Sequence, residues 1–235
     1  MTNFSVVVPL FNEEQNIETL VNEIFLSLKN YNNFELILVD DASTDKTGDI
    51  LNNLKNKNFK NIKIIKNKQN LGQSSALLEG IRFAENKIIV TIDGDGQNNP
   101  KDIPILLDKY VSDENLFLVG GIRKKRKDSY VKIISSKIAN SIRSFVLDDD
   151  CTDTGCSLKV FDKEIFISFT FFDGIHRFMP ALFKGYGKKT YFLNVDHRKR
   201  MHGYSKYGTF DRLFCGIRDL IKVAKIINKF KSNRV

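Results

Sequence analysis

The chain has 235 residues, of which 42% are hydrophobic and 28% charged, so disordered and fibrous classes are excluded and one sizeable folded domain is expected. Its formal net charge of +9 is uneven, because residues 1–120 carry 12 Lys or Arg against 17 Asp or Glu, whereas residues 121–235 carry 25 against 11. No apolar run approaches the roughly 20 residues of a membrane-spanning helix, so any membrane contact is expected to be peripheral.

The first 120 residues alternate between apolar runs and segments of helical length. Strands are predicted at 4–8, 34–39, 62–65, 88–92 and 116–119, and helices near 13–28, 45–54, 73–84 and 100–111. This alternation favours βαβ units and a parallel sheet in one α/β domain. Asn12 suits the N-cap of the first helix, and Ser43 or Thr44 that of the second. Pro100 fits the first turn of the fourth.

Carboxylates directly follow two of the predicted strands. Asp40 and Asp41 come after the second, and Asp93 and Asp95 after the fourth. Ligands of open α/β sheets sit beyond the carboxyl ends of the strands, so these acids are expected to face one crevice. Side chains two residues apart in extended chain point the same way, so Asp93 and Asp95 can present oxygens to one divalent cation and its diphosphate. A solvated Asp-Gly turn is the alternative for an isolated pair.

After Gly121 the chain becomes basic, with a cationic run at 123–127 and helix-like amphipathic segments at 130–147 and 210–230. This basic second half of the chain would attract an anionic acceptor or an anionic membrane surface. The alternative is that its charges only form a solvated surface without a binding role. The segment 210–230 could lie in a membrane interface, or it could be an ordinary terminal helix packing on the sheet.

Three cysteines, Cys151, Cys156 and Cys215, are an odd number in a chain without a signal peptide, which favours a reducing, cytoplasmic setting. A Cys-x4-Cys pair without further ligands at metal-binding spacing is poor evidence for zinc. We expect these side chains to be small buried groups.

Several motifs together resemble family 2 glycosyltransferases, and most closely their dolichol-phosphate-mannose-synthase branch. The motifs, each weak alone, are Val8–Glu14, Val39–Asp45, Asn70–Gly72 and Asp93–Gln97, followed by Asp153–Cys156 and Gly203–Lys206. The resemblance therefore covers nearly the whole chain. It implies a single GT-A domain with a Rossmann-like, mostly parallel central sheet over 1–208 and a basic amphipathic C-terminal helix over 209–235. Within that domain, 1–120 would handle nucleotide sugar and metal, and 121–208 the acceptor.

The activity implied by this resemblance is a metal-dependent, inverting transfer of a sugar from a GDP- or UDP-linked donor to a polyprenyl phosphate. The cofactor would be Mg²⁺ or Mn²⁺. The protein would act at the inner, cytoplasmic face of the membrane, bound peripherally to its anionic surface, and a membrane-anchoring partner could aid it. No nucleic acid is expected, and the donor's base and sugar stay open.

The donor and metal residues follow from the same motifs. Asp95 is the best metal ligand, Gln97 can supply a second oxygen, and Asp93 would face the metal, ribose or sugar. By resemblance, the nucleotide pocket is lined by Pro9, Glu13, Asp41 and, at the same end, Asp40. For Asp40 and Asp45 the alternative is that they only stabilise a helix N-terminus.

A phosphate acceptor brings its own anionic nucleophile, so its enzyme needs cations more than a general base. The resemblance places Arg123 and Arg200 at that phosphate, where the planar guanidinium suits phosphate oxygens. The branch's Arg-x-x-x-Ser element would fall on Val131 and Ser135. Val131 cannot bind phosphate, so Lys132 with Ser136 could substitute. The catalytic residues are thus predicted as Asp95, Arg123, Asp153 and Arg200, and the acceptor-binding residues as Arg123, Lys132, Ser136, Arg200 and Lys206.

Two other functions stay open at this point. A hydroxyl-bearing glycan acceptor would demand a general base, for which Asp153 is the candidate, and Val131 supports this alternative. A non-enzymatic protein that binds nucleic acid or a membrane would use its carboxylates only to cap helices, but no nucleic-acid-binding motif is recognisable. We interpret His176 and His197 as hydrogen-bonded packing residues.

Overall fold

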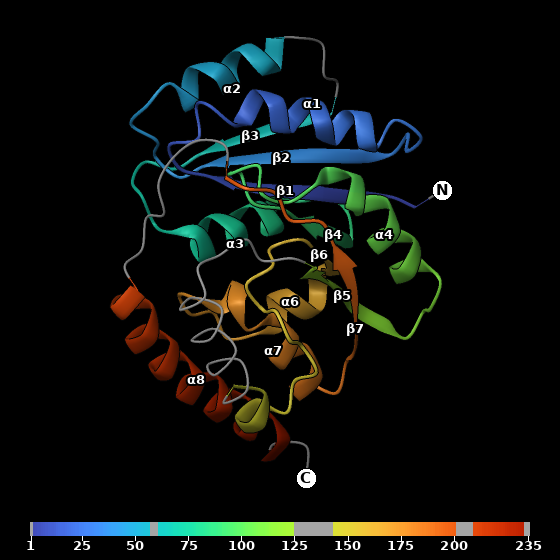
Figure 1. The fold of residues 1–235 in the computed structure, drawn as a ribbon, viewed down its shortest axis with the longest axis vertical. Helices are drawn as coiled ribbons and strands as arrows, with labels where there is room; N and C mark the ends of the chain where they lie inside the picture. The colour runs from blue at the N-terminus through green and yellow to red at the C-terminus, as the bar shows by residue number, and fades with distance from the viewer. Residues whose placement is uncertain (1, 57–60, 125–142, 201–208, 233–235) are drawn as a thin grey trace.

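The computed structural model describes residues 2–56, 61–124, 143–200 and 209–232, and its arrangement is shown in Figure 1. Its strands are β1 (Phe4–Leu10), β2 (Phe34–Asp40), β3 (Ile62–Lys66), β4 (Ile88–Thr91), β5 (Leu116–Arg123), β6 (Lys159–Asp162) and β7 (Lys189–Val195). Its helices are α1 (Ile17–Ser27), α2 (Thr47–Asn56), α3 (Gln73–Phe83), η1 (Pro100–Asp102), α4 (Ile103–Val111), α6 (Lys163–Ser168), η2 (Ile175–Arg177), α7 (Met179–Gly185) and α8 (Thr209–Ser232), with η marking 3-10 helices. Residues 143–147 are also helical.

The strands of the described residues form one sheet in the order β3-β2-β1-β4-β6-β5-β7. The first four strands are parallel, and β6 is antiparallel to both of its neighbours, β4 and β5. At the edge, β7 is parallel to β5. The expected α/β fold with a mostly parallel sheet is therefore confirmed, since strands covered on both faces are recognisable as short apolar runs.

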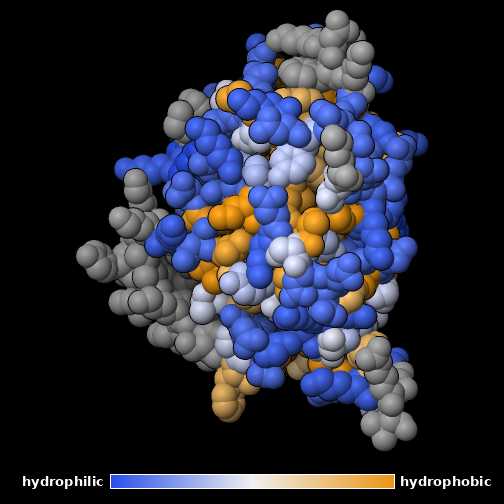
Figure 2. Space-filling model, turned by 90° about the vertical axis from the view of Figure 1, so that its right-hand side faces the viewer, coloured by the Kyte–Doolittle hydropathy of each residue, from blue (hydrophilic) through white to orange (hydrophobic). Residues whose placement is uncertain are grey.

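Helices cover both faces of the sheet and create two hydrophobic clusters. One cluster joins α1, α2 and α4 to the sheet, and the other joins α3, α6, α7 and α8 to its opposite face. Strand β1 serves both, because Val6 and Val8 belong to the first cluster and Val7 between them to the second. Figure 2 shows the side from which β1 begins, where a band of hydrophobic residues crosses a largely hydrophilic face.

Two predicted helix caps are wrong. The first helix begins at Ile17, and Asn12, at φ 54°, accepts a hydrogen bond from the Thr44 backbone N–H at 2.7 Å. Asn12 thus joins two loops at the carboxyl edge of the sheet. In the second helix, Asp45 rather than Ser43 or Thr44 accepts from the Thr47 N–H, at 2.9 Å. Asp45 is therefore structural, as expected.

The C-terminal helix packs on the body of the protein, as the alternative for segment 210–230 proposed. Val223 and Ile227 of α8 are buried, and the rings of Tyr186 and Phe230 stack with centroids 3.7 Å apart. The helix packs closely against α7, since a Cβ on Gly185 would lie 2.7 Å from Ile227 Cδ1. Most of the segment predicted as a helix at 130–147 lies outside the described residues. No helix among those described is long and apolar enough to cross a membrane.

Candidate active site

A cavity of about 410 Å³ lies beyond the carboxyl ends of β1, β2, β4 and β5. Eight predicted site residues line it: Pro9, Glu13, Asp41, Asp93, Asp95, Gln97, Arg123 and Arg200. Asp40 and Asp153 are not among its lining residues. Lys132, Ser136 and Lys206 lie outside the described residues. The fold thus brings the acids of the first half and two arginines of the second half to one place.

Two glycines allow the loop after β4 to present its acids. Gly94 packs against β1 so closely that a Cβ there would lie 2.5 Å from Leu10 Cδ2. Gly96 has φ 70°, a left-handed conformation that side chains beyond Cα disfavour. Asp95 Oδ1 accepts a hydrogen bond from the Gln97 N–H at 3.0 Å, which closes the turn. Neither glycine tolerates a larger residue without strain or displacement.

Asp93 and Asp95 form a carboxylate pair that suits a divalent cation. Burial, and then the charge of Asp95, raise the pKa of Asp93 to about 6. Asp93 Oδ1 accepts from Gln73 Nε2 at 2.7 Å, which fixes its direction. A cation between the two carboxylates would relieve their repulsion, and Gln97 can add an amide oxygen. Within the described ranges no group of three or more His, Cys, Asp or Glu could hold a metal.

Arg200 contacts this acidic pair directly. Its Nη2 donates to Asp95 Oδ2 at 2.5 Å, across 105 residues of sequence. The segment is held in place by Arg198, whose Nη1 donates to both carboxylate oxygens of Glu23 at 2.8 Å and whose N–H donates to the Gln97 carbonyl at 2.8 Å. Arg198 and Glu23 were not predicted, because no local motif marks them.

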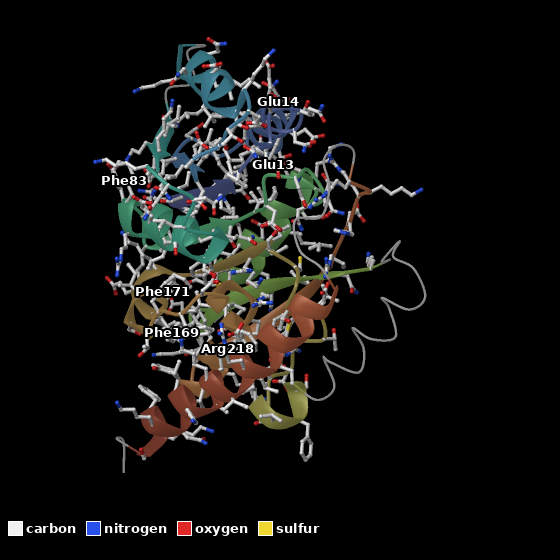
Figure 3. The ribbon with its side chains drawn as sticks, turned by 90° about the vertical axis from the view of Figure 1, so that its left-hand side faces the viewer. Glu13, Glu14, Phe83, Phe169, Phe171 and Arg218 are labelled. Atoms are coloured by element: carbon white, nitrogen blue, oxygen red, sulfur yellow. The ribbon has the colours of Figure 1, made fainter. Side chains whose placement is uncertain are left out.

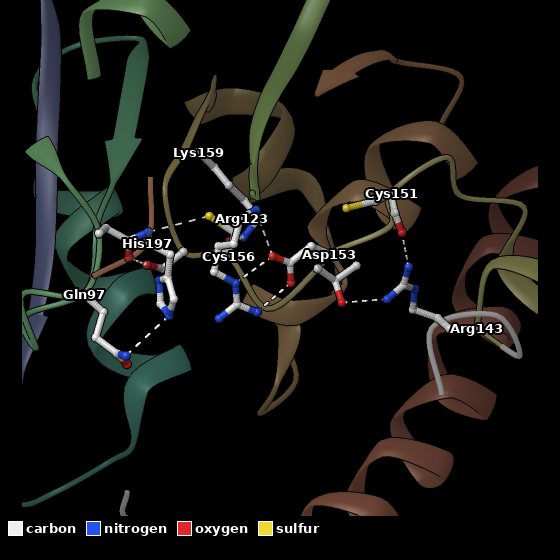
Figure 4. Close-up of polar contacts among 11 residues, drawn as sticks. Gln97, Arg123, Arg143, Cys151, Asp153, Cys156, Lys159 and His197 are labelled. Atoms are coloured by element: carbon white, nitrogen blue, oxygen red, sulfur yellow. Dashed lines mark hydrogen bonds and ion pairs between the residues drawn. The ribbon is translucent and has the colours of Figure 1, made fainter. Parts of the chain in front are cut away.

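Arg123, at the end of β5, forms a two-pronged ion pair with Asp153 (Figure 4). Nε and Nη2 each donate to one carboxylate oxygen at 2.6 Å, and the Arg123 N–H adds a bond of 3.2 Å. Their side chains are only 14% and 8% exposed, so the pair is well shielded. Both carboxylate oxygens of Asp153 thus face Arg123, whereas a general base would need an oxygen directed at the substrate.

The loop that carries Asp153 is held from its other side by Arg143, a buried residue that sequence reasoning missed. Arg143 Nε donates to Asp149 Oδ2 at 2.9 Å, and Nη1 donates to Thr154 Oγ1 at 2.7 Å. Nη2 donates to the Cys151 carbonyl, as Figure 4 shows. Cys151 and Cys156 are buried and free, which confirms the expectation for these two thiols.

Asp41 shapes one rim of the cavity. Its carboxylate accepts from the N–H groups of Leu71 and Gly72 at 3.0 and 2.8 Å and from Asn67 Nδ2 at 2.8 Å. The Asn-Leu-Gly turn is thus fastened to the end of β2. Asp40 instead accepts from the Ser43 N–H at 3.0 Å within its own loop, which agrees with the capping alternative.

Glu13 approaches from the loop between β1 and α1. Its Oε2 accepts from Asn16 Nδ2 at 2.8 Å, and its N–H donates to Thr47 Oγ1 at 2.9 Å. In Figure 3, Glu13 and Glu14 lie beside α1, and Arg218 lies on α8 on the other side of the sheet. Glu13 is therefore anchored to the first residue of α2 and faces the cavity from the α1 side.

His176 has the packing role expected for it. Its Nδ1 lies 2.7 Å from Ser74 Oγ, which also accepts from the Gly174 N–H at 2.8 Å. Burial, and then the charges of Arg177 and Lys159, lower the pKa of His176 to about 3, so the ring is uncharged at neutral pH. His197 Nε2 lies 3.4 Å from Gln97 Nε2, beside the acidic loop.

The family model described as "Glycosyl transferase family 2" matches residues 5–169. The chain belongs to glycosyl transferase family 2. It is 38% identical over 223 residues to the dodecaprenyl-phosphate galacturonate synthase of Rhizobium johnstonii, covering 93% of this chain and 65% of that protein. It is 32% identical over 218 residues to the undecaprenyl-phosphate 4-deoxy-4-formamido-L-arabinose transferase of Photorhabdus laumondii, covering 92% of this chain and 66% of that one. These names confirm the resemblance to the branch of polyprenyl-phosphate sugar transferases, and neither is named for mannose.

A solved structure shares the fold. Glucosyl-3-phosphoglycerate synthase from Mycobacterium tuberculosis, crystallised with Mg²⁺ and uridine diphosphate, superposes with a TM-score of 0.70 at 19% identity, covering 94% of this chain and 78% of that one. At this identity the likeness confirms the expected GT-A fold. The chain spans 62–66% of the length of the curated relatives that it matches.

Proposed function

We propose that this family 2 glycosyltransferase moves a sugar from a nucleotide-diphosphate sugar to a polyprenyl phosphate, with inversion at the anomeric carbon. One observation carries the proposal: a single cavity brings the carboxylates of Asp93 and Asp95 together with the guanidinium groups of Arg123 and Arg200. The acids suit a cation that holds a diphosphate, and the arginines suit a second phosphate. Relatives named for transfer to polyprenyl phosphates support this division.

At the donor end, Asp95, Asp93 and Gln97 would hold Mg²⁺ or Mn²⁺. When bound, the cation supplies positive charge that stabilises the leaving diphosphate. Glu13 and Asp41 face the same cavity from two other loops, where their oxygens can accept hydrogen bonds from ribose or base. The donor site would therefore form almost entirely from the loops after β1, β2 and β4.

At the acceptor end, the arrangement favours a phosphate over a hydroxyl group. A phosphate monoester is already ionised at neutral pH, so it attacks without losing a proton to the protein. Asp153, the residue proposed as a general base for a hydroxyl acceptor, is occupied by Arg123 through both of its oxygens. Arg123 and Arg200 would orient the attacking phosphate opposite the leaving diphosphate, and this single displacement inverts the anomeric centre.

We further propose that the protein reaches its lipid acceptor as a peripheral protein at the cytoplasmic face of the membrane. The second half of the chain carries 25 Lys or Arg against 11 Asp or Glu, which would attract anionic headgroups. Phe145, 91% exposed beside the buried Arg143, offers an apolar contact. A separate anchoring partner would strengthen an attachment that rests on charge and a few apolar side chains.

The test is transfer of radiolabelled sugars from a panel of UDP and GDP sugars, in detergent with Mn²⁺, to three acceptors: undecaprenyl phosphate, undecaprenol and a soluble glycan. We expect label in the lipid extract with undecaprenyl phosphate and at least one donor, and none with undecaprenol. Label in undecaprenol or in the glycan, with none in undecaprenyl phosphate, would contradict the phosphate acceptor and return Asp153 to consideration as a base.

A further inference from the structure

A second cavity, of about 340 Å³, adjoins the first and shares Gln73, Asp93 and Gly155 with it. It lies on the α3 and α8 side of the sheet, among side chains that the catalytic proposal does not use. Its lining residues from β6, η2 and α8 that bear a charge or an imidazole are Lys159, His176, Arg177, Arg218 and Asp219. Its volume is within the usual range for small-molecule sites.

Lys159 places a buried ammonium group in this cavity wall. The residue is 3% exposed, and its Nζ donates to the Cys156 carbonyl, as Figure 4 shows. Among the described residues no carboxylate oxygen lies within 4 Å of Nζ. An ammonium has three N–H donors, and a buried charge with one neutral acceptor is unfavourable unless another group pairs with it. Lys159 therefore has donors left for a ligand.

Arg177 adds a second donor. Its Nη2 pairs with Asp219 Oδ2 at 2.8 Å, but its Nε is buried and has no hydrogen-bond partner among the residues described. The ion pair of Arg177 and Asp219 packs closely against the backbone of Gly174, because a Cβ on Gly174 would lie 2.7 Å from Arg177 Nη2 and 2.8 Å from Asp219 Oδ2. Gly174 also has φ 95°, so only glycine fits here without strain.

The charged groups around this pair of donors are three carboxylates and one arginine. Asp219 pairs with Arg177 and lies 3.9 Å from Arg218 Nε, and Asp93 lies at the boundary with the first cavity, where it accepts from Gln73. Asp173 also lines the cavity, but it is exposed to solvent, whereas Lys159 and the Nε of Arg177 are buried. His176 is uncharged at neutral pH and adds ring surface rather than charge. The ligand group that matches Lys159 and Arg177 is one that accepts hydrogen bonds and carries negative charge.

We propose that the second cavity receives the transferred sugar, and that Lys159 and Arg177 bind a carboxylate on it, so that the donor is a nucleotide-linked uronic acid. This inference rests on the proposed function, because a sugar joined to a diphosphate at Asp95 would pass Asp93, the residue shared by both cavities. The acceptor's phosphate is the other possible anion. Arg123 and Arg200, however, line only the first cavity, which leaves the second for the sugar.

The first experiment compares the binding of UDP-galacturonic acid and UDP-galactose, which differ only at C6, by calorimetry with Mn²⁺. We expect the wild type to bind the uronate about tenfold more tightly, equivalent to about 1.4 kcal/mol. Lys159→Met and Arg177→Lys should each bring the two affinities to within about threefold while leaving that for UDP unchanged. Lys87→Met and Arg82→Lys, on exposed residues away from the cavities, are the matched controls and should keep the preference.

Equal binding of both sugars by the wild type would overturn the inference, as would variants that weaken both sugars equally. Should Lys159→Met fail to fold because the residue is buried, Arg177→Lys decides, since its side chain is 35% exposed and a lysine can still pair with Asp219.

A second readout separates the two sources of negative charge. A rise in KM for undecaprenyl phosphate in Arg177→Lys, with the sugar preference intact, would assign the donors to the acceptor phosphate and overturn the inference. A sugar preference that responds to the variants when no polyprenyl product forms would uphold the uronate inference while contradicting the proposed acceptor.

Discussion

Charge pairing governs what each side chain of the cavity can do. Arg200 forms an ion pair with Asp95, and Arg123 forms one with Asp153, so both predicted phosphate-binding arginines contact a carboxylate. The two pairs differ in consequence. A cation bound at Asp95 would displace Arg200 from that carboxylate, and Arg200 could then bind a phosphate. The bidentate ion pair between Arg123 and Asp153, by contrast, can persist while the remaining N–H groups of Arg123 contact the substrate.

The pair of Arg123 and Asp153 gives a test of positioning against base catalysis. Asp153→Asn should raise KM for undecaprenyl phosphate about tenfold, because a charge-assisted bond to Arg123 becomes a weaker neutral one. UDP affinity should not change. Steady-state kinetics across pH is the measurement. A pH–rate profile that loses its acidic limb in the variant would instead mark Asp153 as a general base.

His176 predicts a specific acid sensitivity. Its pKa is about 3 in the folded protein and about 6.5 in an unfolded chain, so between these values only the unfolded chain binds the proton. Stability should therefore fall as pH drops below 6.5. The loss at pH 5 is about 2 kcal/mol relative to pH 7.5, and His176→Gln should lack this part of it. Urea unfolding at both pH values measures the difference, and identical losses in the two proteins would contradict the assignment.

At the scale of elements, the strands and the acidic loops were predictable from the sequence, whereas the hydrogen bonds and ion pairs that hold the loops in place were not. Strands covered on both faces leave apolar runs in the sequence, and the acids stand directly after them. The bond from Arg198 to Glu23 spans 175 residues, so no local pattern reveals it. Arg143 was missed although its partners Asp149 and Thr154 lie only 6 and 11 residues away, because no motif in the sequence marks it as buried. Asn12 resembled a cap because its actual partner, Thr44, lies in the next loop.

The packing of α3 on the sheet offers a stability test. A Cβ on Gly80 would lie 2.5 Å from Val7 Cγ1 and 2.8 Å from Val39 Cγ2. Gly80→Ala should therefore lower the free energy of unfolding by about 1–3 kcal/mol through overpacking. Gly216→Ala on α8 is the control, because its Cβ would meet nothing within 4 Å and helix propensity predicts a gain of up to about 1 kcal/mol. Denaturant titration that ranks the two variants in the opposite order would refute this account of the α3 contact.

For the whole molecule, the acidic and basic halves of the chain correspond to the donor-binding and acceptor-binding roles proposed for them. The acidic first half supplies the residues proposed for the donor and the metal, and the basic second half supplies the two arginines proposed for the acceptor and the proposed membrane contact. The sequence could predict this asymmetry but not the second cavity, because Lys159, Arg177 and Asp219 meet only in the folded chain.

Membrane attachment is testable with lipid vesicles. The protein should sediment with vesicles rich in phosphatidylglycerol and much less with phosphatidylcholine alone, and raising the salt should release it because screening weakens the attraction. Phe145→Ser should reduce binding with no change in melting temperature, whereas Phe83→Ser, at 54% exposure on α3, should not reduce it. Equal binding to both vesicle types would contradict the role of charge.

The most direct test of the central claim is the cation dependence of sugar transfer in wild type, Asp95→Asn and Asp113→Asn. Asp113 pairs with Lys189 far from the cavity, so it controls for the loss of a carboxylate. We predict that wild type and Asp113→Asn transfer sugar to undecaprenyl phosphate only with Mg²⁺ or Mn²⁺, and that Asp95→Asn loses at least about a hundredfold in rate. Transfer that persists in Asp95→Asn at the wild-type rate would contradict the assignment of Asp95 and, with it, the proposed donor site.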